Sequence, residues 1–100
     1  MDRARAEQLE KDVEMGQGPD SEYHFAFEFE DLPDVVKGMM ILSAVDKRRD
    51  GNFSADVCAE HDIIYYTGYE ESLPDITENE FLKLIELGWF EDADSWAHWT

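Results

Sequence analysis

The stretch ITENEFLKLIELGW, residues 76–89, carries the boundary signals of a helix at both ends. Thr77 and Glu80 form a capping box, in which each side chain bonds the backbone N–H of the other residue. Gly88 is the residue type expected just past a helix end, where Trp89 can close the cap. The apolar residues between these signals recur at helical spacing. They predict a buried stripe of Phe81, Leu84 and Ile85, with Leu87 as a further candidate.

On both sides of this helix the pattern changes to that of strands. Residues 53–60 and 62–67 are rich in β-branched and aromatic side chains, which favour strands. Residues 68–75, which contain acids and a proline, predict a loop. Downstream, an acidic turn at 91–94 leads into a short final strand over 95–100. The second half of the chain therefore predicts strands around one well-capped helix.

Two further elements are expected in the first half. Residues 23–30, YHFAFEFE, alternate aromatic side chains with small or polar ones, which predicts a strand with one face on a core and carboxylates in water. Residues 32–48 place apolar side chains on one face of a helix that ends in three basic residues. Gly38 in its middle is costly in a helix and predicts a close contact between this helix and the sheet.

The chain opens with a polar segment. Residues 1–14 predict a helix whose apolar stripe is narrow, and the breaker over 16–21 follows it. We expect residues 1–20 to form a mobile polar arm or helix and residues 21–100 to form one acidic domain. The predicted fold class is α+β, with a mostly antiparallel sheet of about four strands and one or two helices on one face.

Composition limits the classes of partner. The 100 residues contain 25 acids and 8 bases, which gives a formal net charge of −17 and repels nucleic acids and anionic membranes. The hydrophobic content of 43% is too high for an acidic disordered tail. A single cysteine, Cys58, fits a reducing compartment. Without an apolar leader or membrane-length segment, we expect a soluble protein of the cytoplasm.

Three arrangements could suggest chemistry, and each is a poor match. The segment 46–52 resembles half of a calcium loop, but Arg48 stands where an oxygen ligand is needed. Cys58 and His61 have the odd spacing that places side chains on opposite faces of a strand. His24, His61 and His98 lack the spacing of a zinc site. We therefore expect no enzyme, no cofactor and no dedicated metal site.

The acids are distributed unevenly along the chain. From Asp50 to the end there are 13 acids and one base, Lys83. Carboxylates held at fixed spacing by a fold can imitate the phosphates of nucleic acid and occupy the basic groove of a protein that binds it. This predicts a basic, nucleic-acid-binding protein as the partner. The acids expected to contact it are Glu28, Glu30, Glu60, Asp62, Glu70, Glu71, Asp92 and Asp94.

An alternative is a protein-interaction or assembly module, including a homodimer, that binds through aromatic side chains instead of charge. The residues expected to be exposed for this role are Tyr66, Tyr69, Trp96 and Trp99. Salt separates the two hypotheses, because binding through carboxylates weakens in salt and binding through aromatic rings does not.

The sequence also resembles a family of small acidic proteins of bacteriophages and prophages. The resemblance covers about residues 55–100 and rests on the strand AEHDIIY at 59–65, the helix end LGW at 87–89, and Trp96 in the final strand. It implies a protein expressed in the cytoplasm of a bacterial host. Small acidic phage proteins include anti-CRISPR, anti-restriction and glycosylase-inhibitor proteins, several of them DNA mimics. By analogy with this class, and with no inhibitor motif matched, we expect an inhibitor or modulator.

Overall fold

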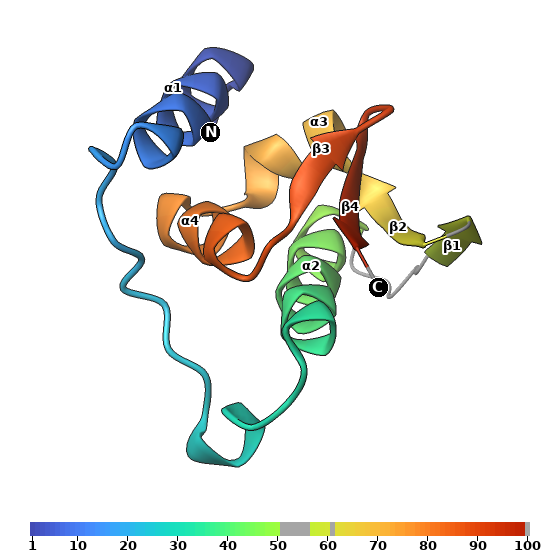
Figure 1. Cartoon of the computed structure of the whole chain (residues 1–100). Coiled ribbons are helices and arrows are strands. Elements are labelled where there is room, and N and C mark those ends of the chain that lie inside the picture. Colours follow the sequence, from blue (N-terminus) through green and yellow to red (C-terminus); the bar gives the residue numbers. More distant parts are fainter. Residues whose placement is uncertain (51–56, 61, 100) are drawn as a thin grey trace.

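The computed structural model describes residues 1–50, 57–60 and 62–99 of the chain. The described residues form an α+β fold, as predicted, in which helices pack on an antiparallel sheet (Figure 1). Within these ranges no helix is long and apolar enough to cross a membrane. The elements, in chain order, are α1 (Arg3–Glu14), the 3-10 turn η1 (Phe27–Phe29), α2 (Asp34–Asp50), β1 (Val57–Glu60), β2 (Ile63–Gly68), α3 (Tyr69–Ser72), η2 (Leu73–Asp75), α4 (Glu78–Glu86), β3 (Phe90–Asp92) and β4 (Ser95–Trp99).

The sheet has the strand order β1-β2-β4-β3, with all neighbours antiparallel. The predicted strands over 62–67 and 95–100 correspond to β2 and β4, and β1 covers the end of the strand predicted over 53–60. The segment 53–56, His61 and Thr100 lie outside the described residues. β3 was missed, because the acidic turn predicted at 91–94 is shorter than expected. Ala93 and Asp94 both have positive φ, at 51° and 58°, as a tight two-residue hairpin turn requires.

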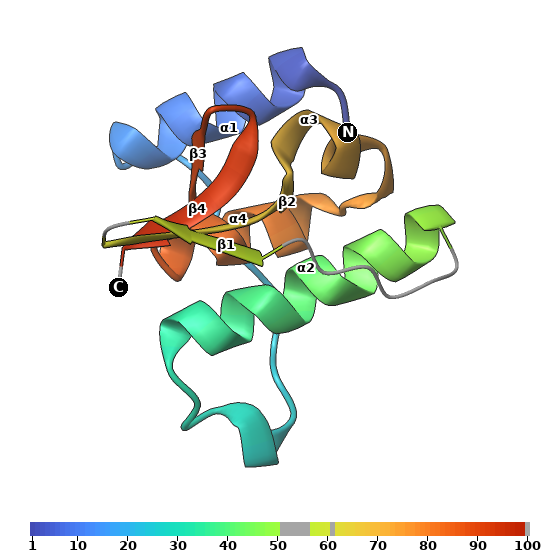
Figure 2. The ribbon, with the colours of Figure 1, turned by 90° about the vertical axis from the view of Figure 1, so that its right-hand side faces the viewer.

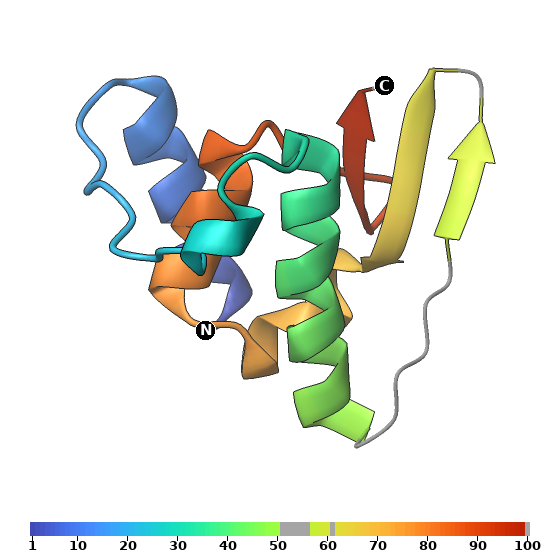
Figure 3. The same cartoon turned by 90° about the horizontal axis from the view of Figure 1, so that it is seen from below.

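The core lies between the inner face of the sheet and the helices. α2 runs between α4 and the strands, as Figures 1 and 3 show. The rings of Tyr69, Phe81 and Trp96 meet with centroids 4.8 to 6.2 Å apart, and the Tyr66 hydroxyl lies 2.7 Å from Ser43 Oγ of α2. Tyr66, Tyr69 and Trp96 are thus buried core residues, so the prediction that they are exposed is wrong.

The signals at both ends of α4 are confirmed. The Thr77 side chain accepts from the backbone N–H of Glu80, and the Glu80 carboxylate accepts from the backbone N–H of Thr77. At the other end Gly88 has a φ of 91°. The backbone N–H of Trp89 then donates to the carbonyl of Leu84, which closes the cap.

The close contact predicted at Gly38 is present, and its partner is a tryptophan beside the sheet. A Cβ atom at Gly38 would lie 1.8 Å from Nε1 of the buried Trp89, the residue between α4 and β3. Two atoms cannot approach so closely, so only glycine lets α2 pack against this indole ring.

The strand predicted over 23–30 is wrong. The segment has no regular secondary structure as far as Ala26 and then forms the turn η1. Alternation alone does not make a strand, since a strand also needs a neighbour for its backbone groups, and none of the described strands pairs with this segment. Phe25 is buried and Tyr23 is half-buried, so the aromatic pattern is satisfied in part, by packing without a sheet.

The N-terminal helix is docked, which differs from the expected mobile arm (Figure 2). Ala6 and Leu9 of α1 are fully buried in the core. The Tyr69 hydroxyl donates to Glu10 at 2.7 Å, and burial raises the pKa of Tyr69. The region predicted as a loop over 68–75 contains α3 and η2, and the N-terminal amine donates to the Leu73 carbonyl at 2.8 Å.

Candidate binding surface

Most of the basic side chains tie elements of the fold together. Within the part of the chain that the structure describes, six of the eight Lys and Arg residues form ion pairs. The pairs between distant elements join a base from the first half of the chain to an acid from the second half. Among the described residues they are Arg3–Glu91 (3.3 Å), Arg3–Asp94 (4.0 Å), Arg5–Glu78 (2.7 Å), Arg48–Glu80 (2.6 Å) and Arg49–Glu71 (2.9 Å).

The pair between α2 and α4 is the most buried of these at its acidic end. Both guanidinium NH groups of Arg48 donate to the two oxygens of the buried Glu80 carboxylate, at 2.6 and 2.7 Å. Burial opposes ionisation of Glu80, but the hydrogen bonds from Arg48 and Thr77 outweigh it and hold the pKa of Glu80 below its usual value. This carboxylate is therefore part of the structure and does not face a partner.

The acids predicted as a site in the second half are partly engaged in the same way. Glu71 pairs with Arg49, and Asp92 accepts from the Tyr65 hydroxyl at 2.8 Å. Asp94 accepts from the backbone N–H of Glu70 at 3.3 Å. The structure thus brings Glu70 and Asp94 together where α3 begins beside the β3–β4 turn.

The remaining predicted acids lie elsewhere. Glu28 and Glu30 are exposed at η1, and because η1 is a turn, the strand-like array expected for them is wrong. Asp62 is exposed just before β2, and Glu60 lies in β1, with its side chain outside the described part of the structure. The predicted acids therefore fall in separate regions and do not form one continuous track.

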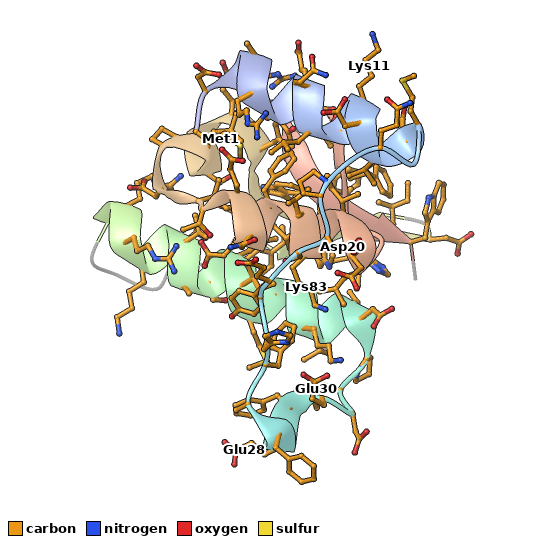
Figure 4. All side chains as sticks on the ribbon, turned by 90° about the vertical axis from the view of Figure 1, so that its left-hand side faces the viewer. Met1, Lys11, Asp20, Glu28, Glu30 and Lys83 are labelled. Carbon is orange, nitrogen blue, oxygen red and sulfur yellow. The ribbon has the colours of Figure 1, made fainter. Side chains whose placement is uncertain are left out.

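The segment that carries exposed acids with few ion pairs is residues 20–34, here called the acidic strap. Residues 12–36 contain eight Asp or Glu and no Lys or Arg. The strap runs past α4 and projects from the body at η1, as the positions of Asp20, Glu28 and Glu30 show in Figure 4. Its exposed carboxylates belong to Asp20, Glu22, Glu28, Glu30, Asp31 and Asp34.

Contacts at both ends hold the strap in place. The Ser21 hydroxyl donates to the Asn79 carbonyl at 2.5 Å, and the backbone N–H of Glu22 donates to Oδ1 of Asn79 at 3.1 Å. Further along, the Lys37 ammonium lies 5.4 Å from the ring centroid of the buried Phe25 and 3.6 Å from the Glu30 carboxylate. The strap is therefore anchored on α4 and α2 while its carboxylates stay in water.

Phe27 at the tip of the strap is 95% exposed. The strand hypothesis placed this ring in the core, so Phe27 was missed as a surface residue. The sequence analysis also did not select four exposed acids of the strap, which are Asp20, Glu22, Asp31 and Asp34. The available signal was the absence of any Lys or Arg over residues 12–36, which contain eight acids.

A cleft of about 160 Å³ lies at the start of the strap. Its lining includes Val13, Pro19, Asp20, Leu82, Ile85 and Glu86. It is smaller than the pockets of about 300–1,000 Å³ that bind small molecules. Within the described residues, no three His, Cys, Asp or Glu side chains converge as metal ligands would.

A second exposed aromatic ring among the described residues lies on the outer face of the sheet. Trp99 of β4 is 59% exposed, and its ring centroid lies 6.0 Å from that of Phe90 in β3. Of the four aromatics predicted to be exposed, Trp99 is the one that the structure leaves on the surface.

The chain was compared with protein-family models, with curated proteins and with solved structures, and no match was found in any of the three comparisons. The resemblance to acidic phage proteins over residues 55–100 therefore stays a prediction.

Proposed function

We propose that this protein acts by binding and not by catalysis, and that its partner is a basic protein whose own ligand is nucleic acid. One observation supports this most strongly. The fold uses most of its bases in internal ion pairs, and the acidic strap, which contains no Lys or Arg, presents its carboxylates to solvent. A surface of this kind attracts basic partners and repels acidic ones.

The class of partner follows from charge complementarity. Proteins that bind nucleic acid carry clustered Lys and Arg on one face, shaped for a row of phosphates. Solvated carboxylates on the strap present the same sign of charge. Binding would thus compete with nucleic acid and, if the phage resemblance holds, would inhibit a host protein.

The test is a capture experiment from a nuclease-treated bacterial lysate with the tagged full chain, washed at about 50 mM and about 500 mM salt. A strap variant, Glu22→Gln with Glu28→Gln and Asp31→Asn, removes three exposed carboxylates. The matched control, Glu7→Gln with Glu14→Gln and Glu86→Gln, removes three exposed carboxylates from α1 and α4. Both variants have the same net charge, so any difference between them reports position.

We expect the wild type and the control to retain a basic protein at low salt, to release it at high salt, and to lose it when duplex DNA is added. The strap variant should retain much less of it. Retention of the same amount by the strap variant and the control would show that the strap is not the contact surface. If the wild type retains no basic protein at low salt, the proposed function is wrong.

The exposed Trp99 beside Phe90 favours a second candidate, an interaction module that binds through the outer face of the sheet. Binding of this kind would persist at high salt and would be lost in Trp99→Ala, whereas the strap variant would leave it unchanged.

A further inference from the structure

Phe27 differs from the aromatic residues on either side of it. Phe25 is buried and Phe29 is half-buried, whereas Phe27 has 95% of its surface in water. Exposed phenylalanine loses the free energy that burial would provide, and large exposed rings are enriched at the centres of protein interfaces. The ring is therefore a candidate for an anchor that a partner buries.

The backbone around Phe27 is held in one shape. The N–H of Phe29 donates to the Ala26 carbonyl at 2.8 Å, and the N–H of Leu32 donates to the Phe29 carbonyl at 3.2 Å. Before the turn, the rings of Tyr23 and Phe25 pack edge to face with centroids 5.0 Å apart. A ring presented on a held turn loses less conformational freedom on binding than one on a loose chain.

The surroundings of Phe27 define the partner that it fits. Glu28, Glu30 and Asp31 follow it directly and are exposed. A second copy of this chain or an anionic membrane would bring further negative charge against these carboxylates. We propose that Phe27 enters an apolar pocket on the basic partner, and that Lys or Arg side chains at the rim of this pocket contact the strap carboxylates. This inference rests on the proposed function and adds the anchor to it.

Phe27→Ala in the full chain tests the anchor, with Met15→Ala as the matched control. Met15 lies outside the strap and is 58% exposed, so both substitutions remove an exposed apolar side chain. In the nuclease-treated lysate at low salt, Phe27→Ala should retain at least about tenfold less of the basic protein that the wild type captures, and Met15→Ala should retain an equal amount. Because the ring is uncharged, the salt dependence of the remaining binding should be unchanged, whereas the strap variant should reduce it.

A photoreactive phenylalanine analogue at position 27 gives a second readout. On irradiation it should cross-link to the same basic protein, and the analogue at position 15 should not. If Phe27→Ala retains as much of that protein as the wild type, the anchor is wrong and the proposed function stands. If the wild type captures no basic protein, both proposals fail. A wild-type dimer that Phe27→Ala abolishes, measured by sedimentation, would also overturn the anchor, because the ring would then serve self-association.

Discussion

The first fourteen residues and the acidic strap are both polar, and they behave in opposite ways. In α1, Arg3 and Arg5 reach Glu91 of β3 and Glu78 of α4, and the apolar stripe is buried. The strap has acids of similar density but no base, and its tip projects into water. In a chain of net charge −17, α1 is thus joined to the body by ion pairs as well as by its apolar stripe, whereas the carboxylates of the strap stay on the surface.

The same contrast distinguishes two roles for a carboxylate. Glu80 is buried, receives a bidentate guanidinium and contributes to stability. Glu28 is exposed at the tip of the strap. Substitutions in the two regions should consequently separate effects on folding from effects on binding.

The largest effect is expected where α1 enters the core. Leu9→Ala removes a fully buried side chain and should lower the free energy of unfolding by about 3 kcal/mol. Phe27→Ala in the strap removes a larger side chain, but it should change the free energy of unfolding by less than about 0.5 kcal/mol because the ring is already in water. Urea denaturation of both variants measures the difference. Equal values for the two would mean that α1 is not part of the folded core.

A smaller loss is expected from the α2–α4 ion pair. Arg48→Ala leaves the buried Glu80 carboxylate without its guanidinium and should lower the free energy of unfolding by about 2 kcal/mol. This is less than the loss of about 3–5 kcal/mol expected for a fully buried pair, because Arg48 itself is partly exposed. Lys47→Ala, which removes the neighbouring exposed base, should cost less than about 0.5 kcal/mol. Thermal or urea denaturation compares the two, and similar losses would contradict the structural role of the pair.

The contribution of this pair should also depend on pH. The pKa of Glu80 in the folded protein is below its ordinary value of 4.5, so the pair stabilises the fold above that pH and loses its effect as the pH falls through the folded pKa. The coupling between Arg48→Ala and Glu80→Gln, measured by a double-mutant cycle in urea, should therefore be largest at neutral pH and decline in acid. A coupling that is constant or that grows in acid would contradict the lowered pKa.

Local sequence signals predicted the parts of the fold that depend on local contacts. Three such signals are present in the structure: the capping box at Thr77, the helix end at Gly88 and the close contact at Gly38. In each, one residue type has the side chain or the backbone freedom that the position needs. The alternation over residues 23–30 failed because strand formation depends on a distant partner. No pattern within eight residues shows whether such a partner is available.

For the candidate site, the sequence predicted a chemistry, in which acids bind a basic partner, and this stays a prediction. The strap acids are now the candidates for that role. Their positions could not be read from the sequence, because the ion pairs that engage Glu71, Glu80 and Glu91 come from bases more than twenty residues away. From the sequence, the excess of acids in the second half indicated a surface of carboxylates without ion pairs. In the fold, part of it balances the arginines of the first half.

The smallest effect on stability is expected from the strap variant itself, Glu22→Gln with Glu28→Gln and Asp31→Asn. These exposed side chains should contribute less than about 0.5 kcal/mol each to stability. Neutralising them relieves repulsion within a strongly negative chain. The free energy of unfolding should therefore be unchanged or slightly higher at low salt. Urea denaturation at low and high salt measures this, with the variant at Glu7, Glu14 and Glu86 as the control of equal charge. A clear loss of stability in the strap variant alone would mean that these carboxylates hold the fold, as Glu80 does. With stability retained, any loss of binding in the same variant is a loss of contact, which is the distinction that the two regions of the molecule predict.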